Sequence, residues 1–85
     1  MKYYVVKLLT NIQGEDGSSV SVYIDDETKT AQDKAIVAYH QTLAAFHNAE
    51  DVLYAIVQVV NEFGNVEIME IVNHKSQPEP NNVND

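Results

Sequence analysis

The chain has 85 residues and a net charge of −8, from five lysines, no arginine and thirteen acidic residues. This length allows one domain that buries only about 60–65% of its unfolded surface, so self-association would add to its stability. Nucleic acids are bound mainly through lysine and arginine, so this composition argues against direct nucleic-acid binding.

The chain contains no cysteine, which excludes disulfides and thiol chemistry. The apolar run that follows Met1 is too short to cross a bilayer and lacks the small-residue pattern of a cleavage site. We therefore interpret it as a strand and expect a cytoplasmic protein without membrane contact.

Residues 2–25 predict a hairpin. The first strand, residues 2–12, is apolar on both faces in its first half, which indicates cover on both sides. Residues 13–19 predict the turn, with Asp16-Gly17 as a strong hairpin dipeptide and Gly14 as a second position for positive φ. Residues 19–25 alternate cleanly, which predicts a half-buried edge strand whose apolar side chains face inward: Val20, Val22 and Ile24.

Residues 28–48 predict the only long amphipathic helix. Thr30 followed by Asp33 resembles a capping box, and acidic residues precede it near the positive end of the helix dipole. Alanines favour the helix and let it lie close to whatever it packs on. The apolar stripe is centred on Tyr39 and also contains Ala31, Ala35, Ile36, Thr42, Leu43 and Phe46.

Residues 52–61 are ambiguous, because their apolar positions also fit a helical stripe. Their β-branched and aromatic content and the Gly64-Asn65 turn before the next run favour a strand. Residues 66–72 predict the fourth strand, and the change of apolar parity near Ile68-Met69 indicates either a bulge or two partly buried faces. Residues 74–85 predict a disordered polar tail.

The predicted fold is therefore α+β with ββαββ order in a single domain, residues 1–73. Two hairpins form one four-stranded antiparallel sheet, and the helix packs on one face as a two-layer sandwich. The sequence does not show which parity of the strands faces the helix.

One helix leaves one face of the sheet open, and the first and third strands are apolar on both faces. An apolar patch of that kind predicts a homodimer, a higher oligomer or a protein partner on the open face. The predicted interface set is Tyr3, Val5, Leu9, Leu53, Ala55, Val57 and Val59, and the opposite parity carries Tyr4, Val6, Leu8, Tyr54, Ile56 and Val60.

No pattern in the chain predicts a metal, a cofactor or a catalytic group. His40 and His47 are seven residues apart, about 10.5 Å along a helix, which is too far for one ion. The acidic residues predict helix capping and surface turns, and they form a candidate acidic surface: Glu15, Asp16, Asp25, Asp26 and Glu27.

Three functions follow as hypotheses. The first is a non-enzymatic homo-oligomeric module that binds a protein or small ligand through the open face or the subunit junction. The second is an acidic inhibitor that blocks the basic groove of a nucleic-acid-acting host enzyme, although the acids occur in scattered pairs. The third is a small enzyme at a dimer interface, with only His40, His47 and Asp33 as candidates.

The opening MKYYVVKLL, the lack of cysteine and arginine, and the short polar tail resemble small accessory proteins of phages and prophages. The resemblance covers roughly residues 1–73 and is one of general character, without a diagnostic motif. It implies a host-directed binding or inhibitory role and assigns no site residue.

Overall fold

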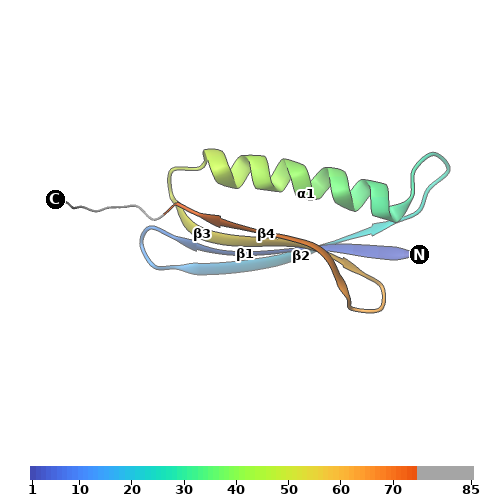
Figure 1. Cartoon of the computed structure of the whole chain (residues 1–85), viewed down its shortest axis with the longest axis horizontal. Coiled ribbons are helices and arrows are strands. Elements are labelled where there is room, and N and C mark those ends of the chain that lie inside the picture. Colours follow the sequence, from blue (N-terminus) through green and yellow to red (C-terminus); the bar gives the residue numbers. More distant parts are fainter. Residues whose placement is uncertain (75–85) are drawn as a thin grey trace.

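The computed structural model describes residues 1–74. Its five elements are β1 (Lys2–Asn11), β2 (Asp16–Ile24), α1 (Ala31–Asn48), β3 (Val52–Asn61) and β4 (Val66–Asn73). The strands form one antiparallel sheet in the order β2-β1-β3-β4, and α1 lies across one of its faces (Figure 1). The predicted α+β fold with ββαββ order is confirmed. The predicted tail lies, beyond His74, outside the described residues.

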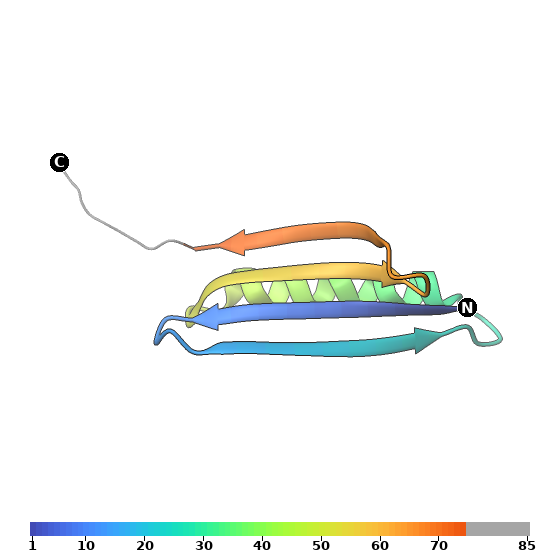
Figure 2. The ribbon, with the colours of Figure 1, turned by 90° about the horizontal axis from the view of Figure 1, so that it is seen from below.

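The segment at residues 52–61 is a strand, β3, which pairs with both β1 and β4. The two strands that are apolar at both parities, β1 and β3, are the two central strands, and β2 lies at an edge as predicted. β2 and β3 run parallel with β1 between them, so β2, α1 and β3 form a right-handed crossover (Figure 2).

α1 begins where the capping box predicts. The hydroxyl of Thr30 accepts a hydrogen bond from the backbone N–H of Asp33 at 3.1 Å. In the same turn, the backbone N–H of Ala31 donates to the carboxylate of Asp25 at 2.6 Å. These oxygens satisfy N–H groups that the first helical turn cannot pair internally.

Both hairpins use the same turn. The side-chain oxygen of Asn11 accepts from the backbone N–H groups of Gln13 and Glu15, at 2.9 and 3.0 Å. Asn61 repeats these bonds fifty residues later with Phe63 and Asn65, at 2.9 and 3.0 Å.

A glycine with positive φ completes each turn: Gly14 at 84° and Gly64 at 87°. The first turn therefore forms at Gly14, and the expectation of a turn at Asp16-Gly17 is corrected, because Gly17 lies within β2.

β4 contains a bulge, which is one of the two alternatives that the parity change leaves open, and it lies one residue earlier than that change. Val59 pairs with Ile68 and Val60 pairs with Val66, so Glu67 is the extra residue. After the bulge, Ile68, Glu70 and Val72 lie on the side of the sheet that α1 covers. Met69 and Ile71 lie on the other side.

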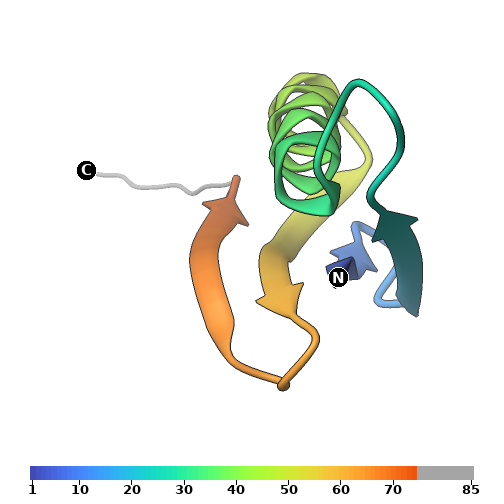
Figure 3. The same ribbon diagram turned by 90° about the vertical axis from the view of Figure 1, so that its right-hand side faces the viewer.

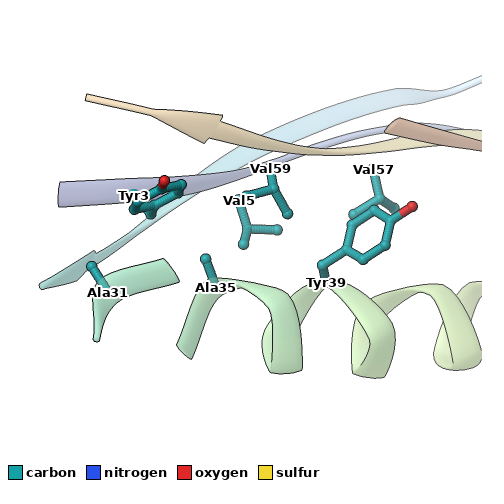
Figure 4. Close-up of a cluster of buried hydrophobic side chains, with 7 residues drawn as sticks. All are labelled: Tyr3, Val5, Ala31, Ala35, Tyr39, Val57 and Val59. Atoms are coloured by element: carbon teal, nitrogen blue, oxygen red, sulfur yellow. The ribbon is translucent and has the colours of Figure 1, made fainter. Parts of the chain in front are cut away.

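The core lies between α1 and the two central strands (Figures 3 and 4). Its largest cluster consists of Tyr3, Val5, Ala31, Ala35, Tyr39, Val57 and Val59. Ala31 and Ala35 are fully buried, so the first half of the helix rests close to the sheet. A second buried cluster, Val52, Ala55 and Val72, lies near the end of the helix.

Candidate functional site

The face of the sheet opposite α1 has no covering element among residues 1–74, and we call it the open face (Figure 2). Strand pairing arranges its side chains in four rows across β2, β1, β3 and β4. The first row is Val22, Tyr4, Val60 and Val66; the second is Val20, Val6, Gln58 and Met69; the third is Ser18, Leu8, Ile56 and Ile71; and the fourth is Asp16, Thr10, Tyr54 and Asn73.

The predicted interface set lies on the other side of the sheet. Five of its members are buried beneath the helix: Tyr3, Val5, Ala55, Val57 and Val59. Leu9 packs at the edge of the second core cluster, and Leu53 lies exposed at the irregularity between β1 and β3. The assignment of these residues to the open face is therefore corrected, and the opposite parity forms that face.

The inward orientation predicted for β2 is also corrected. Val20, Val22 and Ile24 lie on the open face with exposures of 59%, 55% and 56%, whereas Tyr23 packs against the core. The register explains the reversal, since Tyr4 pairs with Val22 and Tyr3 with Tyr23. The sequence contained a signal for this register in its two Asn-x-x-Gly turns. Each turn fixes which residues of its two strands lie opposite each other, because Asn11 pairs with Glu15 and Asn61 with Asn65.

The first three rows contain no charged side chain, although the chain carries a charge of −8. Large apolar groups in them stay half exposed, including Met69 at 50% and Ile71 at 47%. The polar groups there are the side chains of Ser18, at the edge, and Gln58, and the hydroxyl of Tyr4. The Gln58 amide nitrogen lies 3.5 Å from the sulfur of Met69, a weak acceptor.

Polar and charged groups begin at the two ends of the open face. At one end, the Thr10 hydroxyl donates to the Asp16 carboxylate at 2.7 Å. At the other end, Lys2 pairs with Ile24 beyond the first row. The face is therefore apolar in its middle. One end carries Asp16, and the other carries Lys2 together with Glu62, whose carboxylate accepts from the Lys2 backbone N–H at 3.0 Å.

A hollow of about 440 Å³ lies at the acidic end of the open face. Leu8, Tyr54 and Ile56 supply apolar walls, and Thr10, Asp16 and Ser18 supply hydroxyl and carboxylate oxygens. Apolar walls with a few polar groups are typical of small-ligand sites.

The predicted acidic surface is divided between the two ends of the molecule. Asp25, Asp26 and Glu27 precede the helix, and two of them bind backbone N–H groups there. Asp26 also forms an ion pair with Lys34 at 2.7 Å, and this contact lowers the pKa of its carboxyl well below the usual range. Donation from the Ala31 N–H likewise lowers the pKa of Asp25.

Glu15 and Asp16 lie at the opposite end, in the β1–β2 connection and the start of β2. There the backbone N–H of Ile12 donates to the carbonyl of Asp51 at 2.9 Å. This bond brings the acidic pair Glu50-Asp51 next to the first turn, a proximity that the sequence does not reveal.

The histidines remain apart from this surface. His40 and His47 are exposed on α1, and the His40 ring meets Tyr39 edge-on with centroids 5.1 Å apart. A ring nitrogen of His74 lies 2.8 Å from the carbonyl oxygen of Val52. Within residues 1–74, no three His, Cys, Asp or Glu side chains gather closely enough to hold a metal ion.

Comparison of the chain with protein-family models, with curated proteins and with solved structures finds no match. In the part of the chain that the structure describes, no helix has the length and apolar character needed to cross a membrane.

Proposed function

We propose that this protein is a non-enzymatic binding module that associates with a second copy of itself through the open face. The observation that carries the proposal is the complete absence of charge from three rows of a solvent-exposed sheet face. Monomers rarely expose a continuous apolar patch of this size, so such a face indicates a contact surface.

A second copy fits this face better than a basic partner. Two chains of charge −8 repel one another least where the contact itself carries no charge, and the first three rows of the open face carry none. A basic partner would instead be attracted to the acidic ends of the molecule. The chemistry of the surface therefore favours self-association.

The size of the face also fits a dimer. Strands lie about 4.8 Å apart and rise about 3.3 Å per residue, so four strands of about ten residues present roughly 600 Å² before side-chain relief is counted. Stable interfaces bury about 800 Å² of accessible surface per partner, and transient interfaces bury less. The hollow beside Tyr54 would lie at the rim of such a dimer, where a small ligand could contact both subunits.

Light scattering after size exclusion tests the proposal with two matched variants. Val20→Glu places a carboxylate in the second row of the open face, on edge strand β2, and Val37→Glu makes the same change on the exposed side of α1. Burying an unpaired charge costs about 3 kcal/mol or more, which weakens association roughly a hundredfold.

We expect a wild-type dimer, a dissociated Val20→Glu variant and a Val37→Glu variant like the wild type. A monomeric wild type at 100 µM, or equal behaviour of both variants, would contradict the proposal. Val5 and Val57 are unsuitable for this test because both are buried in the core, where a glutamate would disrupt folding itself.

The acidic inhibitor remains a second candidate, and one observation favours it. The bond between Ile12 and Asp51 gathers the acidic pairs Glu15-Asp16 and Glu50-Asp51 at one end of the molecule. An inhibitor acting through this end would lose affinity steeply as salt rises, because exposed charges are screened. Affinity for a basic enzyme that barely changes with salt would contradict this second function.

A further inference from the structure

Resting on the proposed self-association, we propose that the two copies pack face to face with their strands antiparallel. In this arrangement the two-fold axis lies between the two sheets, runs perpendicular to the strands and follows the second row. Each strand then overlies its own copy in the opposite direction, and the first row of one copy covers the third row of the other. Gln58 meets the partner's Gln58, and Lys2 reaches the partner's Asp16.

Gln58 is the first reason for this arrangement. It stands on central strand β3 in the second row, among apolar neighbours, and its amide has only the Met69 sulfur as a weak partner. A buried amide without hydrogen bonds is strongly unfavourable. A glutamine amide both donates and accepts, so two copies facing each other across the axis satisfy one another.

The charges at the ends of the open face are the second reason. Lys2 lies two residues before the first row on β1, and Asp16 lies in the fourth row on β2, bonded to Thr10. Inverting one copy about the second row places the Lys2 end above the partner's Thr10, and Asp16 is next to Thr10. Each dimer therefore contains two contacts between opposite charges at the rim of the apolar rows.

The alternative two-fold axis runs along the strands between β1 and β3. That arrangement lays β1 over the partner's β3, so Gln58 faces the partner's Val6 and its amide stays unsatisfied. Lys2 then lies near the partner's Glu62, which directly follows β3, and not near the partner's Asp16. Glu62 of the same chain also contacts Lys2, so only a mixed-isotope Lys2–Glu62 peptide reports this arrangement. The two arrangements thus predict different neighbours for one lysine.

Carbodiimide cross-linking of the unmodified protein distinguishes them, because it joins a lysine directly to a carboxylate. Within one chain, Asp16 pairs with Thr10, eight residues along β1 from Lys2. That separation is roughly 26 Å, so a Lys2–Asp16 cross-link must join two subunits. A mixture of ¹⁴N- and ¹⁵N-labelled protein identifies intersubunit peptides by mass spectrometry.

We expect mixed-isotope Lys2–Asp16 peptides in the dimer fraction. A dimer that yields mixed-isotope Lys2–Glu62 peptides and no Lys2–Asp16 peptide would overturn the antiparallel arrangement and leave the proposed function intact. A protein that stays monomeric in light scattering would overturn both, so the two failures are distinguishable.

Charge variants at Gln58 provide a second test that does not depend on cross-linking. In the antiparallel dimer, Gln58→Glu and Gln58→Lys each place like charges against each other, and a mixture places opposite charges together. We expect each variant alone to associate at least about tenfold more weakly than the wild type, and the equimolar mixture to form a heterodimer. A mixture that associates no better than the separate variants would overturn the contact between the two Gln58 side chains.

Discussion

The hydroxyl of Tyr3 on β1 donates a 3.0 Å hydrogen bond to the carboxylate of Glu67, the extra residue at the bulge of β4. Asn61 donates to the same carboxylate at 3.2 Å, and Gln32 donates to its other oxygen at 3.1 Å. One exposed side chain thus joins β1, β3 and α1 to the edge strand.

Glu67→Ala removes these three hydrogen bonds, so we expect a fall of a few degrees in the melting temperature. Tyr3→Phe removes one of them and should reproduce part of the fall. Glu70→Ala is the matched control, because Glu70 makes no side-chain hydrogen bond or ion pair within residues 1–74. Equal melting temperatures for Glu67→Ala and Glu70→Ala would show that the bulge contacts contribute nothing.

Acidification tests the carboxylates that bind N–H and ammonium groups. The contacts of Asp26 with Lys34 and with the N–H groups of Thr28 and Lys29 lower its pKa in the folded state. A lowered pKa means that the stabilisation is present above the unfolded-state pKa, about 4, and is lost as pH falls through the folded-state pKa. We therefore expect the stability difference between wild type and Asp26→Asn to shrink from pH 6 toward pH 2.

Thermal melts at fixed protein concentration measure this difference. Taking the difference between two proteins at each pH cancels most of the change in overall charge. A difference that stays constant over this range would mean that the ionised carboxylate of Asp26 does not stabilise the fold.

The assignment of the two sheet faces predicts opposite outcomes for one substitution. Val57 is fully buried beneath α1, whereas Val22 is 55% exposed on the open face. We expect Val57→Ala to reduce the free energy of unfolding by about 2 kcal/mol, from lost burial and an unfilled cavity. Val22→Ala should cost less than about 0.5 kcal/mol at protein concentrations too low for the proposed dimer to form. Urea denaturation measures both, and the reverse order would contradict the assignment.

The two hairpin turns predict a pattern among the three glycines. Gly14 and Gly64 have positive φ, which costs a residue with a side chain about 1 kcal/mol. Gly14→Ala and Gly64→Ala should each destabilise the protein by about that amount. Gly17 lies in β2, and a Cβ there would sit at an ordinary distance of 4.0 Å from Leu9. Gly17→Ala should therefore be neutral or slightly stabilising. A large loss of stability at this position would instead support a turn at Asp16-Gly17.

The start of α1 depends on the Thr30 cap. Removing its hydroxyl with Thr30→Ala leaves the Asp33 N–H without its acceptor and should cost about 1 kcal/mol. Thr30→Ser keeps the hydroxyl and should retain most of the stability. If urea denaturation finds the two variants equally stable, the hydroxyl is not the stabilising group.

The sequence alone determined the order and type of the elements, because these depend on local patterns. Periodicity and the Thr30 cap located α1, and β-branched residues identified β3 as a strand. It also showed that β1 and β3 are apolar on both faces, but the strand order that makes them central came from the structure.

The tertiary structure decided which face the helix covers. Alternation along a strand separates Val5 from Val6 but does not assign either to a side. That choice depends on the strand order and on the right-handed crossover from β2 through α1 to β3, which join residues distant in sequence. The structure therefore places the candidate surface on the side of the sheet that carries Gln58, not on the side that carries Val57. This surface also includes the exposed valines of β2.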